Sequence, residues 1–250
     1  MTTVVKLGGN SMDELPDLLD FVSRIEGPVV LVHGGAPQIT SMMKRLGFEG
    51  TFHQGLRVTD TATLEVTQMV LTGQVNKQIV VAAQQRGLAA VGLSGLDGGL
   101  LQADLHSNGA LGHVGVVREV RVKLLRTLLK QNFVPVISPL GLGPEHTVLN
   151  INADMSAAAI ASRLGAERLV FLTNVDGLLD HARNTIPSVS PEGVAELIRT
   201  GVITQGMIPK IESALEALAG GVKRVEIRNA SAGRGTTLCR EGENVVETVP

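Results

Sequence analysis

Aromatic side chains are scarce in this 250-residue sequence, which contains five Phe and neither Trp nor Tyr. Stacking of aromatic rings on nucleic-acid bases or on sugars is therefore a poor expectation. The single cysteine, Cys239, cannot form an internal disulfide and has no C-x-x-C neighbour, so we expect a small apolar side chain rather than a redox or metal site. The first residues lack a basic segment followed by an apolar one, so we expect a cytoplasmic protein.

Long apolar runs and blocks of like charge are also missing. The apolar stretches 27–33 and 133–137 are far shorter than the roughly 18 residues that a membrane span requires. Lys and Arg number 22 against 24 Asp and Glu, so neither a membrane nor a nucleic acid is expected as a partner. A hydrophobic share of 44% excludes intrinsic disorder and suffices for one large domain or two halves.

Short β-branched runs alternate with segments of helical period, which indicates an α/β fold around a mostly parallel sheet. The predicted strands are almost wholly apolar, as strands buried on both faces should be, and they span 3–7, 28–32, 89–93, 134–138, 168–173 and 224–228. The predicted helices span 14–24, 37–46, 62–86, 120–131, 153–164 and 207–219. Residues 100–115 are more polar and contain glycine, and we expect them to form a hairpin at the edge of the sheet.

Two glycine pairs directly follow predicted strands, in Lys6-Leu7-Gly8-Gly9 and in His33-Gly34-Gly35-Ala36. Glycines let the backbone approach a ligand, while a lysine and a helix N-terminus favour an anion, so the two turns together suit a phosphate group. Each turn alone would also suit a tight bend, and His33 is better explained as satisfying nearby backbone groups than as a catalytic group. Neither the Walker A pattern nor G-x-G-x-x-G occurs, which disfavours P-loop and dinucleotide-binding enzymes.

Two further polar clusters lie in the middle of the chain. Arg57, within Gly55-Leu56-Arg57-Val58-Thr59-Asp60, could bind a carboxylate through two hydrogen bonds, and Thr59 or Asp60 could cap the helix that follows. Surface arginines are common, so spacing alone leaves the role of Arg57 open. Asn150, Asn152 and Asp154 alternate, and in an extended segment they would face one side. The structural alternative is that Asn152 or Asp154 is only a helix N-cap.

The last cluster is divided between residues 172–179 and 204–210. The first segment follows a strand with a turn that could hold a nucleotide, and the second places Lys210 at the start of a helix. Lys210 alone is most simply a solvated lysine. Together with Lys6 it offers two cations for one transferring phosphoryl group.

In this order, the segments K-L-G-G, H-G-G, G-L-R-V-T-D, N-I-N-A-D and G-M-I-P-K resemble the amino-acid kinase family, and the resemblance covers residues 3–250. It implies the amino-acid kinase fold, a three-layer αβα sandwich. An N-terminal lobe, 1–165, would bind the amino-acid substrate and dimerise, and a C-terminal lobe, 166–250, would bind ATP on the same continuous sheet. Within the family, the chain is similar to the branch that transfers the γ-phosphoryl group of ATP to the side-chain carboxylate of N-acetyl-L-glutamate in arginine biosynthesis.

The resemblance also implies a role for each matched residue. Lys6 and Lys210 would stabilise the transferring group, and Asp154 would orient the two lysines. Gly9 and Gly35 would donate backbone N–H groups to phosphate oxygens. The amino-acid substrate would contact Gly35, Ala36, Arg57 and Asn150. The ATP site would consist of Asn174, Val175, Asp176, Gly177, Leu178, Leu179, Val202, Ile203, Thr204 and Lys210.

The chemistry of these residue types agrees with transfer to a carboxylate. A glutamate-like carboxyl group has an ordinary pKa of about 4.3, so it is ionised at neutral pH and needs no general base. The reaction instead needs cations and backbone donors that offset the repulsion between the carboxylate and the phosphates. No carboxylate cage for a metal stands out, so Mg²⁺ is expected to arrive on the ATP phosphates.

Departures from the family pattern define the alternatives. The usual third glycine of H-G-G-G is Ala36, which bears on substrate choice. A related branch that phosphorylates aminoadipate or glutamate on a carrier protein generally lacks G-L-R-V-T-D, so free N-acetyl-L-glutamate is favoured. Carbamate, glutamate and aspartate kinases are further alternatives, as is a non-catalytic nucleotide-binding sensor, which would need neither lysine. Arginine-inhibited hexameric members carry an extra N-terminal helix, for which the start of this chain leaves no room, so we expect an arginine-insensitive homodimer.

Overall fold

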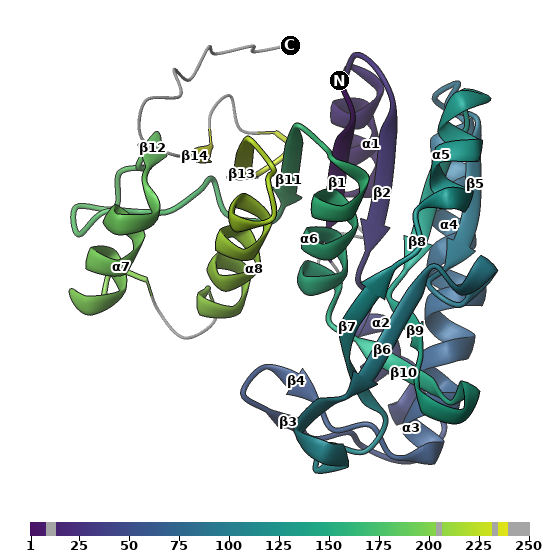
Figure 1. The fold of residues 1–250 in the computed structure, drawn as a ribbon. Coiled ribbons are helices and arrows are strands. Elements are labelled where there is room, and N and C mark those ends of the chain that lie inside the picture. The colour runs from purple at the N-terminus through teal and green to yellow at the C-terminus, as the bar shows by residue number, and fades with distance from the viewer. Residues whose placement is uncertain (9–13, 204–206, 232–234, 240–250) are drawn as a thin grey trace.

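The structure is a computed structural model that describes residues 1–8, 14–203, 207–231 and 235–239. Its centre is an eight-stranded sheet with the strand order β12-β14-β13-β11-β1-β2-β8-β5 (Figure 1). The strands are β1 (Thr3–Leu7), β2 (Val29–His33), β5 (Ala90–Ser94), β8 (Val134–Ser138), β11 (Arg168–Leu172), β12 (Ser188–Val189), β13 (Arg224–Arg228) and β14 (Thr236–Cys239). All neighbouring strands are parallel except β13 and β14. The six strands predicted from apolar runs are confirmed to within one residue at each end.

Helices cover both faces of this sheet. Side chains alternate between the faces of a strand, and accordingly Val5, Leu7 and Leu31 belong to one apolar core while Val4 and Val32 belong to another. The first core is closed by α1 (Leu15–Ser23), α2 (Ala36–Arg45), α3 (Thr61–Gln68) and α4 (Asn76–Gln84). The second is closed by α5 (Lys123–Lys130), α6 (Ala153–Leu164), α7 (Pro191–Arg199) and α8 (Ile208–Ala219). The three-layer αβα sandwich is confirmed.

The segment expected as a hairpin at the edge of the sheet belongs to a second sheet. β6 (Leu101–Leu105) and β7 (Val114–Val120) do form an antiparallel pair, but they close a small barrel with β9 (Leu140–Leu142) and β10 (Val148–Ile151). The prediction of an edge position was wrong because β7 pairs with β10 and β6 with β9, two short strands from much later in the chain. A separate two-stranded hairpin consists of β3 (Phe52–His53) and β4 (Leu56–Arg57).

The helix predicted over 62–86 is interrupted. Between α3 and α4, residues Met69–Val75 form the π-helical segment η2. A π-helical turn contains one more residue than an α-helical turn, which changes the side chains that face the sheet. Among the described residues, short 3₁₀ segments are η3 (Asp97–Gly99), η4 (His106–Gly109) and η5 (Pro144–His146). Within the described residues, no helix combines the length and apolar character that a membrane crossing needs.

Candidate active site

Lys6 and Lys210 both bind the carboxylate of Asp154. Lys6 Nζ lies 2.9 Å from Asp154 Oδ1, and Lys210 Nζ lies 3.1 Å from the same oxygen and 3.3 Å from Oδ2. Lys6 is on β1, Asp154 is in the first turn of α6, and Lys210 is in the first turn of α8. The three side chains are mostly buried, with exposed fractions of 9%, 15% and 12%. One carboxylate between two ammonium groups leaves an excess positive charge at the carboxyl end of the central strands, where ligands of parallel sheets bind.

The ionisation of this cluster is set by burial and by the mutual proximity of its charges. Burial alone would raise the pKa of Asp154, but Lys6 and Lys210 together lower it to about 2. Burial and the neighbouring Lys6 lower the pKa of Lys210 to about 8, against the opposing effect of Asp154. Asp154 is therefore an anion at neutral pH, and Lys210 is still mostly a cation.

The turn after β2 lies next to this cluster. The Gly34 N–H donates to the Leu7 carbonyl over 3.1 Å, so the pairing of β1 and β2 continues past the strand ends. Gly35 then precedes α2, whose first N–H groups have no acceptor within the helix and lie at its positive end. A Cβ atom on Gly35 would lie 2.5 Å from Leu71 Cδ2, so the turn has no space for a side chain. These features fit the expected anion-binding turn.

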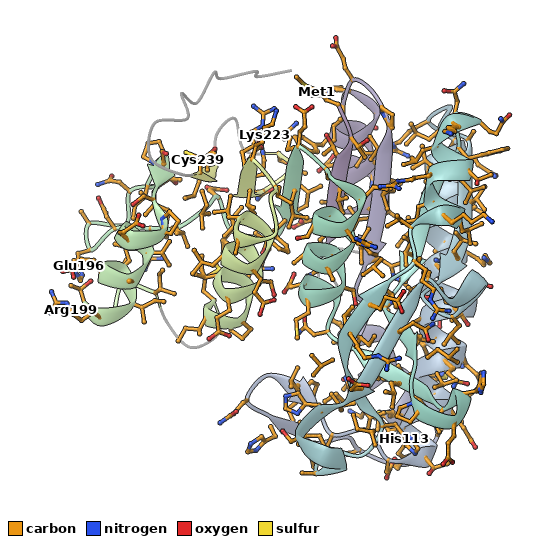
Figure 2. The ribbon with its side chains drawn as sticks, viewed as in Figure 1. Met1, His113, Glu196, Arg199, Lys223 and Cys239 are labelled. Atoms are coloured by element: carbon orange, nitrogen blue, oxygen red, sulfur yellow. The ribbon has the colours of Figure 1, made fainter. Side chains whose placement is uncertain are left out.

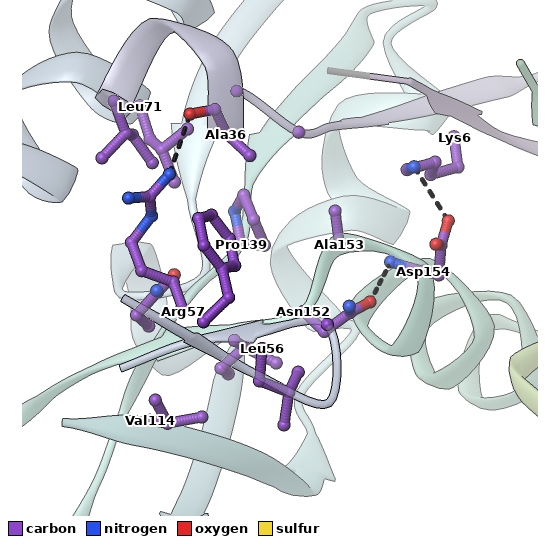
Figure 3. A pocket seen from close by; sticks show the side chains of 17 residues that line it. Lys6, Ala36, Leu56, Arg57, Leu71, Val114, Pro139, Asn152, Ala153 and Asp154 are labelled. Carbon is purple, nitrogen blue, oxygen red and sulfur yellow. Dashed lines mark hydrogen bonds and ion pairs between the residues drawn. The ribbon is translucent and has the colours of Figure 1, made fainter. Parts of the chain in front are cut away.

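A cavity of about 190 Å³ joins the charged cluster to Arg57. Its lining includes Lys6 and Asp154 toward one end and Arg57 toward the other, with Pro139 and Asn152 between them (Figure 3). Gly34, Gly35, Ala36 and Asn150 also line it. The volume is below the roughly 300–1,000 Å³ typical of pockets for drug-sized ligands, so the cavity suits a molecule about the size of an amino acid.

Arg57 is a buried cation with neutral partners. Its side chain is 6% exposed, its Nη2 donates to the Ala36 carbonyl over 2.9 Å and to Thr40 Oγ1 over 2.7 Å, and its Nη1 contacts Met43 Sδ at 3.4 Å. The guanidinium also stacks 4.4 Å from the centroid of the Phe52 ring. Burial lowers the pKa of Arg57. Among the described residues no carboxylate pairs with it, and a buried charge without a counter-ion favours an anionic ligand.

The alternating residues Asn150, Asn152 and Asp154 all line the cavity, but they do not lie in one extended segment. β10 ends at Ile151 and α6 begins at Ala153, because the Asn152 side chain accepts hydrogen bonds from the Asp154 and Met155 N–H groups and caps the helix. The expectation of a continuous extended segment was therefore wrong. Asn150 Nδ2 donates to Thr59 Oγ1 over 3.1 Å, which ties β10 to the segment that carries Arg57.

The residues expected at an ATP site lie between β11 and the first turn of α8, which contains Lys210. Asn174 and Asp176 are exposed, and Gly177 has a φ of 147°, with Thr236 and Thr185 so close that a side chain would clash. The side chains of Leu178 and Ile203 pack in the apolar core beside α8, so only their backbones are available to a ligand. Val175, Leu179 and Val202 are half-buried. Gly9 and Thr204 lie outside the described residues.

His33 lies behind the glycine turn and is not part of the cavity lining. The ring is 1% exposed, and burial lowers its pKa from 6.5 to about 4 despite the hydrogen bond with the Gly34 carbonyl. The expectation that His33 satisfies a nearby backbone group is confirmed by the 2.9 Å contact between Nδ1 and the Gly34 carbonyl.

The buried neutral ring predicts a pH-dependent stability. The unfolded chain binds a proton on His33 below about pH 6.5, whereas the folded chain does so only near pH 4, so this contribution is complete above pH 6.5 and is lost as the pH falls. We expect the free energy of unfolding to fall by about 2 kcal/mol between about pH 7.5 and about pH 5 on this account. Urea unfolding at the two pH values measures the change. An equal change in His33→Asn would show that other groups cause it.

Several lining residues were missed by the sequence analysis. Phe52 and Leu56 reach the cavity because β3 and β4 form a hairpin, and the only signal for it was the Gln54-Gly55 pair, whose φ angles are both positive. Leu71 lies within the helix predicted over 62–86, and Pro139 follows the strand predicted over 134–138, but neither was predicted to line a site. No local pattern marks them, because their position depends on the π-helical segment and on the barrel.

Comparison with known proteins identifies the family. The family model described as the amino acid kinase family matches residues 1–229. The acetylglutamate kinase of Geobacillus thermodenitrificans is 49% identical over 90% of this chain and 89% of its own, and that of Methanopyrus kandleri is 44% identical over 94% and 99%. A crystal structure of a Streptococcus mutans protein superimposes with a TM-score of 0.81 at 30% identity, over 95% of this chain and 98% of that one. The fold, the glycine turns and these similarities lead to one conclusion: the chain belongs to the amino acid kinase family.

Proposed function

We propose that this protein is an ATP-dependent kinase that phosphorylates the side-chain carboxylate of N-acetyl-L-glutamate, a step of arginine biosynthesis. The observation that carries the proposal is one cavity with a buried, unneutralised arginine at one end and two lysines sharing one carboxylate at the other. An amino acid with two carboxylates, one to be bound and one to be phosphorylated, matches this distribution of charge. The acetylglutamate kinases at 44–49% identity support the choice of substrate.

The residues divide the work by their chemistry. Arg57 and Asn150 hold the α-carboxylate and its neighbouring groups, while Gly35 and Ala36 contact the rest of the acetylated amino acid. Lys6 and Lys210 stabilise the charge on the transferring phosphoryl group, and Asp154 holds the two ammonium groups close together and in place. Gly9 and Gly35 donate backbone N–H groups to phosphate oxygens.

The nucleotide occupies the other side of the lysine pair. Its site is formed by Asn174 through Leu179, by Val202 through Thr204 and by Lys210, so the N-terminal lobe, 1–165, binds the amino acid and the C-terminal lobe, 166–250, binds ATP. The substrate carboxylate is already ionised at neutral pH, so the transfer requires no general base. The γ-phosphoryl group moves in line from the β-phosphate oxygen to the carboxylate oxygen.

Magnesium would be carried into this site by the ATP phosphates and would offset part of their charge. No group of three His, Cys, Asp or Glu that could hold a metal occurs in the part of the chain that the structure describes. Asp154, the acidic residue at the centre, already binds two ammonium groups with its carboxylate oxygens. The donor set therefore fits a metal that keeps most of its ligands from phosphate and water. We further propose that the protein is a cytoplasmic homodimer and that arginine does not inhibit it.

An ATP-dependent hydroxamate assay tests the function. Hydroxylamine traps the acyl phosphate, and the assay is run in parallel on N-acetyl-L-glutamate, glutamate, aspartate and N-acetyl-aminoadipate. We expect turnover with N-acetyl-L-glutamate alone. Turnover with N-acetyl-aminoadipate instead would contradict the choice of substrate. No turnover with any of the four would contradict the proposal in favour of a carrier-bound substrate or a sensor.

A further inference from the structure

The His33 ring has two fixed hydrogen bonds that the proposed mechanism does not use. Nδ1 lies 2.9 Å from the Gly34 carbonyl, and Nε2 lies 3.1 Å from Asn76 Nδ2. A carbonyl oxygen can only accept, so Nδ1 must carry a proton. Because His33 is neutral in the folded protein, Nε2 is then unprotonated and accepts from Asn76.

The orientation of Asn76 is fixed by its other neighbours. Its Nδ2 also lies 2.9 Å from the Val136 carbonyl and 3.2 Å from the Leu93 carbonyl, and its Oδ1 accepts from Lys77 Nζ over 3.0 Å. Acceptors surround the nitrogen and a donor faces the oxygen, so the amide cannot be reversed without loss of these bonds. Asn76 is buried, with 1% of its surface exposed. Because its amide donates to Nε2, it holds the ring of His33 in the tautomer that is protonated at Nδ1.

The approach of Asn76 depends on two features of the fold. Asn76 directly follows the π-helical segment Met69–Val75, and the extra residue in its turn changes which side chains of α4 face the sheet. On the strand opposite, Gly92 leaves room for the amide, since a Cβ atom there would lie 2.0 Å from Asn76 Oδ1. The same π-helical segment places Leu71 against Gly35. The helix thus supports the glycine turn both by packing and through His33.

The bond from His33 determines the orientation of the peptide between Gly34 and Gly35. In a trans peptide the carbonyl and the following N–H point in opposite directions. The Gly34 carbonyl faces the ring of His33, so the Gly35 N–H faces away from it, toward the side on which Gly34 and Gly35 line the cavity. We propose that His33, held by Asn76, is a positioning residue that orients the Gly35 N–H toward the transferring phosphoryl group. This inference rests on the proposed function.

Two substitutions of His33 separate this role from simple support of the core. Asparagine places an amide N–H near the position of Nδ1 and retains the donor to the Gly34 carbonyl. Glutamine places an acceptor near the position of Nε2 and retains the bond from Asn76, but it loses the donor to Gly34. We expect His33→Gln to lower kcat by about 10- to 100-fold with little change in KM for N-acetyl-L-glutamate, because a misdirected donor loses most of its effect in the transition state. His33→Asn should retain most of kcat.

The opposite ranking, or an equal loss of kcat in both variants that follows their loss of stability, would overturn the positioning role. A measurement on the unaltered protein covers the case in which a variant does not fold. NMR with ¹⁵N-labelled histidine at neutral pH should show the His33 ring protonated at Nδ1 and unprotonated at Nε2. The Nε2–H tautomer would overturn the inference. The ring measurement needs no substrate, so it separates failure of this inference from failure of the proposed function, which the hydroxamate assay of the unaltered enzyme reports.

Discussion

Replacing Lys210 by alanine is expected to lower kcat by about 100- to 1,000-fold while KM for N-acetyl-L-glutamate changes by less than about threefold. The reason is that Lys210 reaches the cluster from α8 and contacts Asp154, whereas the cavity proposed for the amino acid is lined by Lys6 and Asp154 but not by Lys210. Its charge is therefore needed mainly when negative charge develops on the transferring group. Steady-state kinetics with both substrates measures the split.

A matched lysine on the surface provides the control. Lys223, labelled in Figure 2, has a side chain that is 64% exposed and pairs with Glu167 at 3.7 Å. Lys223→Ala should leave both kinetic constants near their original values, because exposed ion pairs contribute little. A large rise in KM for the amino acid in Lys210→Ala, with kcat retained, would instead assign Lys210 to ground-state binding.

The second large effect is expected at Arg57, with the opposite kinetic signature. Arg57→Ala should raise KM for N-acetyl-L-glutamate by about 100-fold and change kcat at saturation much less, because loss of a buried, hydrogen-bonded charge pair costs about 2–5 kcal/mol. Arg57→Lys retains the charge but lacks the planar fork that matches a carboxylate, so its KM should also rise clearly. KM for ATP should stay nearly constant in both variants.

The exposed Arg199 is the control for Arg57. Its side chain is 73% exposed, it pairs only with Glu196 of the same helix among the described residues, and Figure 2 shows both side chains at the left edge of the molecule. Arg199 is not among the residues that line the cavity. Arg199→Ala should not change KM for the amino acid. If Arg57→Ala lowered kcat as strongly as Lys210→Ala while KM stayed constant, the assignment of Arg57 to substrate binding would be wrong.

The sequence was sufficient for the layered fold because the buried strands are continuous apolar runs. The predictions 134–138 and 153–164 match β8 and α6 at both ends. The pairing of Lys6 with Lys210 could also be anticipated. Lys6 lies near the carboxyl end of a predicted parallel strand and Lys210 lies at the start of a predicted helix, and the carboxyl ends of parallel strands and the N-termini of the helices meet at one edge of an α/β sheet. Their shared contact with Asp154 is the corresponding finding of the structure.

What the sequence could not provide depends on contacts between distant segments. The π-helical segment Met69–Val75 has no distinctive composition, and it matters because Asn76 bonds to His33 and to carbonyls of β5 and β8. The barrel strands β9 and β10 are only three and four residues long, too short for a periodic signal. The hairpin of β3 and β4, which places Phe52 on the guanidinium of Arg57, has two residues in each strand.

The most direct test of the central claim is a crystal structure of the protein with N-acetyl-L-glutamate and a non-hydrolysable ATP analogue. The account predicts the α-carboxylate of the amino acid on Arg57 and its side-chain carboxylate facing the γ-phosphate beside Lys6, with Lys210 on the phosphate side. Binding of the amino acid with its side-chain carboxylate on Arg57, or outside the cavity that joins Arg57 to Asp154, would contradict it.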